Sequence, residues 1–305
     1  MADIKTPHIP VMLSEVLSSL APKDGEIYVD ATFGNGGYTE AILKSADCKV
    51  IAIDRDPNVI KRAEELKSVY KDHFEFRAGQ FSDIYSLINQ PINGAVFDIG
   101  VSSMQLDQSE RGFSFSKDAP LDMRMSCSGL SAYDIVNDTE EKELADIIYK
   151  YGEERKSRQI AAKIAAYRKT KPIETTKELA EIIYTVLHKT PNAIDPATRT
   201  FQALRIAVNN ELNELEQGLN GALKLLKSDG RMVVVTFHSL EDRIVKTFFK
   251  EHTGKNMHVS RYMPEPVNTG DADFASCSKA LMPSQKELDE NKRARSAKLR
   301  FAVKK

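Results

Sequence analysis

The stretch VDATFGNGGYTEAI at residues 29–42 joins an apolar run to a glycine cluster and then to a helical pattern. Glycines at a strand-to-helix turn permit a tight turn and let a ligand approach bare backbone. Asp54 ends a second apolar run about 20 residues after the glycines, where a carboxylate can accept both hydroxyls of a ribose. A tight connection without a ligand is the alternative interpretation. The spacing favours a nucleoside-containing cofactor.

Short apolar runs alternate with helical patterns through the first hundred residues, which predicts a parallel sheet covered by helices on both faces. A fifth apolar run at residues 230–237 resumes the alternation of strands and helices, and residues 298–303 could add a final edge strand. We therefore predict an α/β, Rossmann-like fold with strand order 3-2-1-4-5. The first four predicted strands are residues 26–33, 49–54, 74–79 and 94–100.

The alternation stops between about residues 106 and 200, where the spacing is strongly helical and no good strand candidate occurs. We predict an all-helical inserted domain at 106–199. The main domain would then consist of residues 1–105 and 200–305.

Three further predictions concern the second half of the chain. One long helix is expected at 200–226, and another helix is expected to begin at Ser239 with a capping box to Asp242. Residues 263–276 have the composition of a loop.

The net charge of the 305-residue chain is only −1, so a nucleic-acid partner would have to be met by a local patch. Residues 291–305 carry seven Lys or Arg and no acid. A solvated tail and a contact with RNA phosphates are both open interpretations of this segment. The helical stretch at 153–169 is expected to be a solvated face whose basic side could contact a ribosome.

The three cysteines are far apart and include no C-x-x-C pair, so neither a disulfide framework nor a zinc site is implied. No apolar run approaches the length of a membrane span. We expect a cytoplasmic protein with no metal and no membrane partner.

Asp30 helps to discriminate between cofactors. A dinucleotide fingerprint would have a third glycine where Thr39 stands, and Asp30 would repel a pyrophosphate. S-adenosyl-L-methionine has no phosphate, and its ammonium and sulfonium groups are cations that Asp30 could stabilise. Asp30 could instead cap the following helix. We predict that Asp30 holds the methionine end of S-adenosyl-L-methionine above Gly36 and Gly37.

Asp98 ends the fourth predicted strand. In a sheet of order 3-2-1-4-5 the crevice opens between strands one and four, so Asp98 is expected to face the same cavity as Asp30. Burial of a carboxylate without a partner is expensive, so we expect Asp98 to have one. Ser102 and Gln105 follow in a polar turn.

Nine short motifs resemble those of one known family. In chain order they are TFGNGGY, AIDRDP, DIGVSSMQLD, RGFSF, PLDMRM, YGEER, PATRTFQALRI, FHSLEDRIVK and RARSAKLR. Together they are similar to the bacterial methyltransferases that modify the exocyclic amine (N4) of a decoding-region cytosine in 16S ribosomal RNA. The resemblance runs from His8 to Ala302.

This resemblance implies a class I S-adenosylmethionine-dependent methyltransferase with an inserted helical domain. The implied target is cytosine 1402 of 16S rRNA, within the small ribosomal subunit or a late assembly intermediate. A homodimer is a further possible assembly of the chain. The cofactor contacts implied by the family are Gly36, Gly37, Tyr38, Asp54, Phe81, Asp98 and Gln105, to which the residue pattern adds Asp30 and Gly34.

The chain departs from the family pattern at three positions. Tyr38 and Asp195 stand where the family often has histidine, and Met104 stands where it often has proline. Phe81 is expected near the adenine, with ordinary core packing as the alternative.

Cytosine's exocyclic amine is a poor nucleophile because its lone pair is delocalised into the ring. An enzyme must accept a hydrogen bond from the amine and hold the nitrogen in line with the sulfonium methyl. We predict direct transfer, because no cysteine lies in a motif for thiolate attack on the ring. The candidate catalytic residues are Asp98, which would polarise the amine, and Ser102. Asp98 could equally be a pure cofactor contact.

Candidate RNA contacts are aromatic side chains, on which unstacked bases lie, and arginines that meet phosphates. Core packing and surface ion pairs are strong alternatives for these residue types, and a histidine at the end of the fifth strand could simply cap the next helix. The candidates are Arg111, Phe113, Phe115, Arg124, Arg199 and His238.

Three other functional classes remain open. A nicotinamide-dependent oxidoreductase would share the fold, although Asp30 and Thr39 disfavour it. A non-catalytic assembly factor that binds the same cofactor is harder to exclude. An amino-methyltransferase that acts on DNA or on a small molecule is the third.

Overall fold

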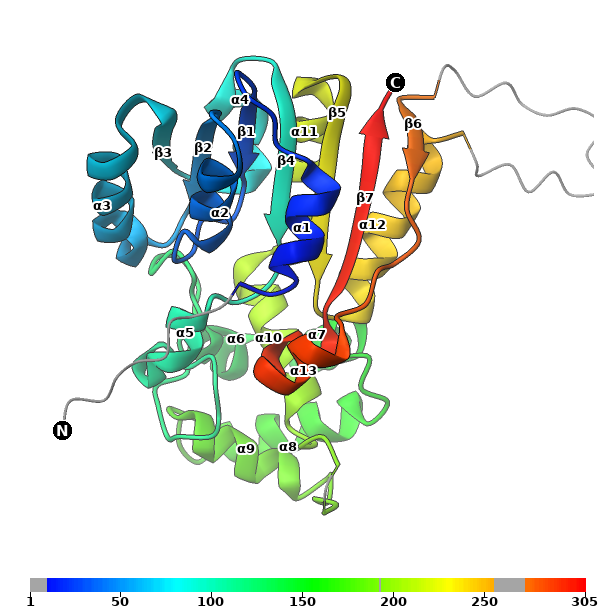
Figure 1. Cartoon of the computed structure of the whole chain (residues 1–305). Helices are drawn as coiled ribbons and strands as arrows, with labels where there is room; N and C mark the ends of the chain where they lie inside the picture. The colour runs from blue at the N-terminus through cyan, green and yellow to red at the C-terminus, as the bar shows by residue number, and fades with distance from the viewer. Residues whose placement is uncertain (1–9, 192, 255–271) are drawn as a thin grey trace, which may run out of the picture. The chain divides into compact units, whose positions relative to one another are not determined.

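The computed structural model describes residues 10–191, 193–254 and 272–305 (Figure 1). Across these described residues, none of the helices combines the length and the apolarity that crossing a membrane requires. Residues 263–271 of the predicted loop at 263–276 lie outside the described residues, and its last three residues are not a loop but part of a strand, Phe274–Cys277.

The chain divides into two compact units. Unit 1 comprises Met1–Gly100 and Leu212–Lys305, and unit 2 comprises Val101–Glu211. The predicted insertion at 106–199 falls within unit 2, which also takes in the short α5 (Ser103–Asp107) and α10 (Thr198–Asn209). α10 belongs to unit 2 because it packs extensively on α7 (Glu141–Gly152).

Unit 1 contains a seven-stranded sheet of order β3-β2-β1-β4-β5-β7-β6 (Figure 1). The first five strands pair in parallel, and β7 pairs antiparallel with both β5 and β6. The predicted order 3-2-1-4-5 and the α/β Rossmann-like fold are therefore confirmed. The strands are β1 Ile27–Asp30, β2 Lys49–Asp54, β3 Phe74–Ala78, β4 Ile92–Asp98, β5 Leu226–Thr236, β6 Phe274–Cys277 and β7 Lys298–Lys304.

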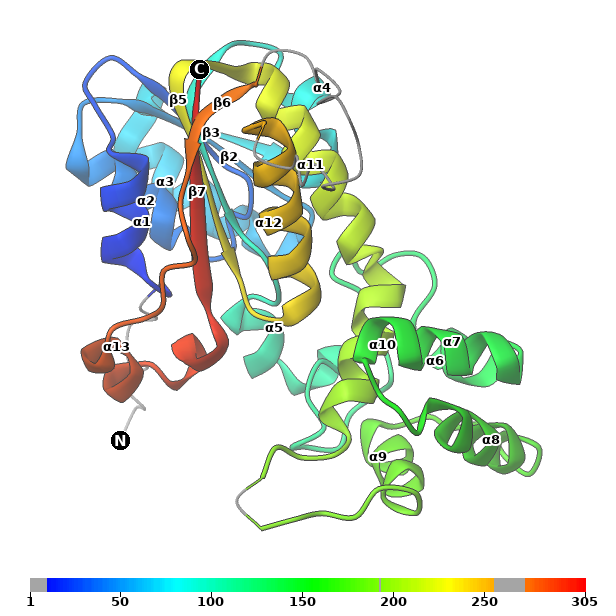
Figure 2. The ribbon, with the colours of Figure 1, turned by 90° about the vertical axis from the view of Figure 1, so that its right-hand side faces the viewer.

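Both faces of this sheet are buried, as the apolar runs predict. Val29 and Phe97 point into one core with α4, α11 and α12, whereas Tyr28 and Val96 point into the other with α1 and α2 (Figure 2). Successive side chains of a strand alternate between faces, so an apolar run fills both cores. The helices of unit 1 are α1 Leu13–Leu20, α2 Gly37–Ser45, α3 Ile60–Tyr70, α4 Ile84–Ile88, α11 Glu211–Leu225, α12 Ser239–His252 and α13 Gln285–Glu290.

The C-terminal segment 291–305 is in part a strand, and its contact with RNA phosphates stays a prediction. Its strand β7 is interior to the sheet, and the edge strand is β6, which the sequence had not predicted. Arg300 donates to Asp242 at 2.7 Å, and the Lys298 ammonium lies 3.4 Å from the same carboxylate. The second half of the segment is therefore a paired strand rather than a solvated tail.

Two helix boundaries also differ from prediction. The expected helix at 200–226 is two helices, because Asn210 adopts a left-handed conformation with φ 51° between α10 and α11. Asparagine tolerates this conformation better than most residues. α12 begins at Ser239 as predicted, but its capping box is formed by His238 and Glu241, one residue earlier than expected.

Unit 2 is helical, and its described residues, 101–191 and 193–211, contain only an isolated bridge between Pro120 and Thr175 rather than a strand. It has a core of its own, with Ile148, Ile164 and Leu204 fully buried. Its remaining helices are α6 Ala132–Asp138, α8 Ser157–Arg168 and α9 Thr176–Tyr184.

Gly152 permits the close approach of α7 and α10. A Cβ atom at this position would lie 2.5 Å from the carbonyl oxygen of Arg199 and 3.3 Å from the Cβ of Ala203. Gly152→Ala is therefore expected to lower the free energy of unfolding by about 1–3 kcal/mol, measured by urea denaturation. In an open helix the same change adds roughly 0.5–1 kcal/mol of stability, so a stabilised variant would contradict the packing argument.

Candidate active site

Three carboxylates of unit 1 lie where β1, β2 and β4 end. Asp30 pairs in register with Ala52 of β2 and Val96 of β4, and Asp54 and Asp98 are the last residues of their strands. Pairing continues beyond β1, since the Ala31 amide donates to Val96 at 2.9 Å. The carboxyl edge of the sheet is thus strongly acidic.

The glycine cluster forms the turn between β1 and α2. Gly34 has φ 52°, and its amide donates to Asp54 Oδ2 at 2.7 Å, which links the loop to the end of β2. Gly36 has φ 76° at the N-cap of α2, and a Cβ there would lie 2.8 Å from Leu66. A Cβ on Gly37 would meet Pro10 at 2.3 Å. The turn therefore needs glycine for its conformation and packing, and the contact of these glycines with a cofactor stays a prediction.

Asp30 is completely buried and bonded within the protein. Its Oδ2 accepts bonds from the Thr39 amide at 3.1 Å and the Thr39 hydroxyl at 2.7 Å, and its Oδ1 accepts from the Thr32 amide at 3.2 Å. This arrangement matches the helix-capping alternative, and an interaction with the methionine end of a cofactor stays a prediction. Burial raises the pKa of Asp30 to about 6, opposed by the bonds from Thr39 and Thr32.

Asp98 is differently placed. Its Oδ1 is buried and has no hydrogen-bond partner among the residues that the structure describes. Its backbone amide donates to the Thr32 hydroxyl at 2.7 Å, which fixes the end of β4 against the loop after β1. Burial first, and then the charges of Asp30 and Glu241, raise the pKa of Asp98 to about 8. A cation or an N–H donor at Oδ1 would relieve this cost.

These carboxylates suit a cationic ligand better than an anionic one. Burial also raises the pKa of Asp54, and the Asp54 charge contributes to the raised pKa of Asp30. The negative potential would repel a pyrophosphate and favour an ammonium and a sulfonium. The residues present therefore fit S-adenosyl-L-methionine, and the part of the cofactor that each carboxylate would contact stays a prediction.

The two aromatic candidates of unit 1 make packing contacts. Phe81 packs edge to face on Phe97 with ring centroids 5.9 Å apart, and a Cβ on Gly218 would lie 2.7 Å from its ring. Tyr38 is buried, and its hydroxyl donates to the Val11 carbonyl oxygen. Phe81 is only partly buried, so an adenine contact stays a prediction.

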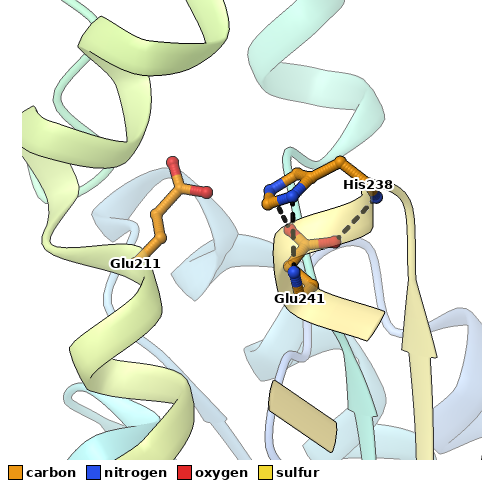
Figure 3. A group of neighbouring side chains, drawn as sticks. All are labelled: Glu211, His238 and Glu241. Atoms are coloured by element: carbon orange, nitrogen blue, oxygen red, sulfur yellow. Dashed lines mark hydrogen bonds and ion pairs between the residues drawn. The ribbon is translucent and has the colours of Figure 1, made fainter. Parts of the chain in front are cut away.

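His238 and Glu241 form the capping box of α12 (Figure 3). Glu241 accepts from the Phe237 amide at 2.7 Å and from the His238 amide at 3.1 Å, and one of its oxygens lies 2.8 Å from His238 Nε2. The Glu241 side chain is fully buried, and only 10% of the His238 side chain is exposed. The geometry matches the helix-capping alternative for His238, and a contact with RNA stays a prediction.

Glu241→Gln is expected to lower the free energy of unfolding by about 1 kcal/mol, because a neutral amide oxygen would replace the carboxylate that accepts the Phe237 and His238 amides. Chemical denaturation measures the change. The exposed Glu251→Gln on the same helix serves as the control. Equal stability of the two variants would contradict a structural role for the Glu241 charge.

In unit 2, Ser102 and Gln105 cap α5. The Gln105 amide donates to Ser102 Oγ at 3.2 Å, and the Ser102 amide donates to Gln105 Oε1 at 3.0 Å. Gln105 is buried. The capping box accounts for these contacts, and the catalytic role of Ser102 and the cofactor contact of Gln105 stay predictions.

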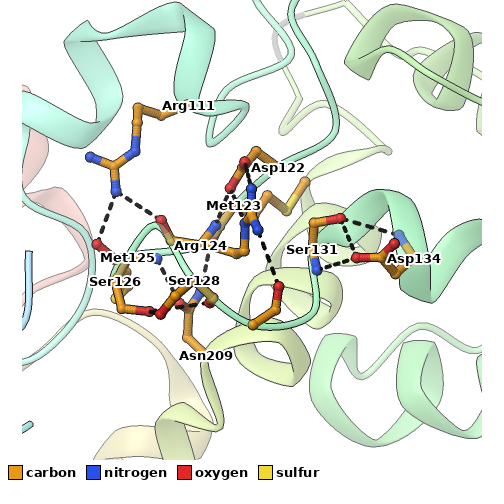
Figure 4. Close-up of polar contacts among 11 residues, drawn as sticks. Arg111, Asp122, Met123, Arg124, Met125, Ser126, Ser128, Ser131, Asp134 and Asn209 are labelled. Atoms are coloured by element: carbon orange, nitrogen blue, oxygen red, sulfur yellow. Dashed lines mark hydrogen bonds and ion pairs between the residues drawn. The ribbon is translucent and has the colours of Figure 1, made fainter.

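Arg111 and Arg124 bond within the loop that follows α5 (Figure 4). The buried Arg111 guanidinium donates to the carbonyl oxygens of Arg124 at 2.8 Å and Met125 at 3.0 Å. The Arg124 guanidinium donates two hydrogen bonds to the Asp122 carboxylate, at 3.0 and 2.6 Å. Asn209 closes the network, since it accepts from the Met125 amide at 2.9 Å. Both arginines therefore bond to the protein itself, and their contacts with RNA phosphates stay predictions.

The remaining RNA candidates differ in exposure. Phe113 and Phe115 are partly buried against the core of unit 2, and the Phe115 ring lies 4.6 Å from that of Phe201. Arg199 is the most accessible, with 59% of its side chain exposed and an ion pair to Glu154 at 3.9 Å. Their contacts with RNA stay predictions.

Four residues that organise these sites are absent from the predicted site residues. Thr32 and Thr39 hold the ends of the strands together, Glu241 acts on the pKa of Asp98, and Asn209 holds the loop of unit 2. A capping box placed one residue earlier, on FHSLE, would have found Glu241. The other three act through tertiary hydrogen bonds that leave no local pattern.

A model of the MraW methylase family matches residues 5–305. The chain belongs to the MraW methylase family. A Rickettsia felis relative, "Ribosomal RNA small subunit methyltransferase H", is 55% identical over 300 residues, which covers 97% of this chain and 98% of the relative. The resemblance in the nine motifs is therefore confirmed. As an MraW methylase the chain is a methyltransferase, and its methyl donor is S-adenosyl-L-methionine.

Two solved structures are also similar. One is a candidate rRNA methylase from Clostridium thermocellum, with TM-score 0.46 and 12% identity over 98% of this chain and all of the other. The second is a candidate methyltransferase from Streptococcus mutans in complex with SAH, with TM-score 0.45 and 13% identity over 98% of this chain and all of the other.

Proposed function

We propose that the chain methylates the exocyclic N4 of cytosine 1402 in 16S rRNA, within the small ribosomal subunit or a late assembly intermediate. The observation that carries the chemistry is the buried Asp98 Oδ1, which has no partner among the described residues. A relative that is 55% identical across its length and named as a small-subunit rRNA methyltransferase supports the RNA target. Asp98 is then a catalytic residue that accepts a hydrogen bond from the target amine.

When bound, S-adenosyl-L-methionine supplies an electrophilic methyl on a sulfonium. Asp98 accepts a hydrogen bond from the N–H of the cytosine amine, which makes the nitrogen lone pair more available for attack. Thr32 fixes the Asp98 backbone during this step. Transfer of this methyl to the amine nitrogen would form the N–C bond and leave the electron pair of the broken C–S bond on sulfur. The pKa of Asp98 is raised to about 8 in the free protein, and a cationic methyl donor beside it would favour the ionised carboxylate, which can take up the proton that leaves the nitrogen.

The test uses small subunits isolated from cells that lack the modification, with labelled methyl donor and mass mapping of the nucleosides. Label on the cytosine amine at position 1402 is the expected result. Label on another nucleotide would contradict cytosine 1402 as the target. A protein that binds the donor and the subunit but transfers no methyl would favour the non-catalytic assembly factor.

A further inference from the structure

The segment from residue 155 to 173 is the most one-sided stretch of charge in unit 2. It contains seven Lys or Arg and no Asp or Glu, although the whole chain has a net charge of −1. The rest of the protein is therefore net acidic, and a polyanion that binds it needs a defined basic surface.

α8 sorts this segment into two faces. Ile160, Ala161 and Ile164 are fully buried against neighbouring helices, and α8 lies beside α7 and α9 (Figure 2). At about 100° per residue, the positions opposite this buried side are exposed. The exposed cations are Arg158 and Lys163 on the helix, with Arg155 before it and Lys169 at its C-cap.

Within the described part of the chain, these four cations form no hydrogen bond and no ion pair. The other three cations of the segment are engaged: Arg168 donates to the Val136 carbonyl at 2.8 Å, Lys156 donates to the Val186 carbonyl at 3.3 Å, and Lys171 pairs with Glu178. The four are Arg155, Arg158, Lys163 and Lys169, and we name them the α8 basic face.

Small residues separate these charges. Ala162 and Ala166 lie on the same side of α8 and are exposed, and the other exposed residue there, Gln159, is uncharged. α7, which packs beside α8, exposes three acids, Glu141, Glu143 and Asp146, but also Lys142 and Lys150. An anionic backbone would therefore be attracted more strongly to α8 than to α7.

We propose that the α8 basic face binds the phosphate backbone of the RNA substrate. This inference rests on the proposed function and adds the surface by which the substrate is held. Several unpaired cations on one helix can each contact a phosphate, and each such contact releases counterions. The face supplies affinity and orientation, whereas recognition of the target base belongs to the catalytic site.

The test compares wild type with a variant in which all four cations become glutamine, R155Q/R158Q/K163Q/K169Q. Binding to protein-free 16S rRNA is measured over a series of KCl concentrations. For every phosphate that the variant no longer binds, the plot of log K against log salt should become shallower by about 0.7. The Michaelis constant for RNA should rise about tenfold or more, while kcat at saturating RNA and the affinity for S-adenosyl-L-methionine stay unchanged.

Lys142→Gln is the matched control, because Lys142 is an exposed cation of the same unit that lies on α7. It should leave the salt slope as in wild type. An equal slope for the fourfold variant and wild type would overturn the proposal. Weaker binding to intact subunits with unchanged binding to protein-free RNA would also overturn it, and would assign the face to an acidic ribosomal protein.

This result is separable from the proposed function. If wild type binds RNA with a salt slope that depends on the α8 basic face but labels no cytosine, the phosphate surface is supported and the methylation proposal fails. If wild type labels the cytosine and the slope is unaffected by the four substitutions, the phosphate surface fails alone.

Discussion

Asp98→Asn should lower kcat for methyl transfer by about 100- to 1,000-fold at saturating cofactor and RNA. The asparagine oxygen still accepts a hydrogen bond, but it carries no charge with which to polarise the amine and cannot take up the released proton. Rates of label transfer under single-turnover conditions measure the effect on the chemical step. Saturating concentrations separate this effect from weaker binding.

Two controls accompany this variant. Asp47→Asn changes an exposed carboxylate at the other end of β2 and should leave kcat unchanged. The Asp98→Asn protein should not be less stable than wild type at pH 8, because the substitution removes a carboxyl group that burial disfavours in its charged form. A kcat within threefold of wild type would remove Asp98 from the transfer step and leave it as a cofactor contact.

The affinity for S-adenosyl-L-methionine should rise with pH between about pH 6 and pH 8. Burial raises the pKa of Asp30 to about 6 and that of Asp98 to about 8, so both titrate in this window in the free protein. A cationic ligand favours the ionised carboxylates, so binding releases protons and strengthens as pH increases. One proton released per ligand corresponds to up to tenfold in Kd per pH unit.

Isothermal titration calorimetry at several pH values, in buffers of different ionisation enthalpy, measures both Kd and the number of protons released. S-adenosylhomocysteine is the matched ligand, because it keeps the ammonium but lacks the sulfonium charge, and its affinity should depend less on pH. Asp98→Asn should flatten the upper part of the profile. A profile for wild type that is flat from pH 6 to 8 would mean that neither carboxylate senses the ligand charge.

The same pKa values predict the opposite pH dependence for the stability of the free protein: its free energy of unfolding should fall as pH rises. A carboxyl group whose pKa is higher in the folded state stabilises the fold below its unfolded pKa and loses that contribution as pH rises through the folded pKa. The free energy of unfolding contributed by Asp98 should therefore decline between about pH 4 and pH 8. Stabilisation by the cationic ligand should grow over the upper part of this range.

The sheet could be predicted because its strands follow local rules. The run KVIAID at Lys49–Asp54 is apolar, rich in β-branched residues and bounded by charge, and the structure has β2 at the same residues. The alternation of strands and helices then fixed the order of the parallel part. β6 was not predicted because Phe274–Cys277 is a short strand at the edge of the sheet, paired with β7.

Helix breaks and helix caps depend on single residues rather than on a repeating pattern. Apolar spacing runs through Asn209 and Asn210 without interruption, so it predicts one helix, whereas the left-handed conformation of Asn210 ends α10. The structure shows why Asn209 precedes this break: its side chain bonds to Met123 and Met125 of a loop more than eighty residues earlier in the chain. No local pattern contains that information.

The candidate site also has one feature that the sequence predicts and one that it does not. The gathering of Asp30, Asp54 and Asp98 follows from the rule that parallel strands end at one edge of a sheet. Asp30 accepts bonds from the Thr32 amide and from the amide and hydroxyl of Thr39, whereas Asp98 Oδ1 has no partner among the described residues. Sequence therefore located the carboxylates, but the tertiary hydrogen bonds distinguish their chemistry.

The position of β7 has a consequence for biosynthesis. Lys298–Lys304 pairs with β5 on one side and β6 on the other, so a strand from late in the sequence lies in the interior of the sheet. Domains generally fold as the chain is made, from the N-terminal side. Unit 2 is therefore synthesised before unit 1 can be completed, because β5 and β6 are not joined until residues 298–304 have been made.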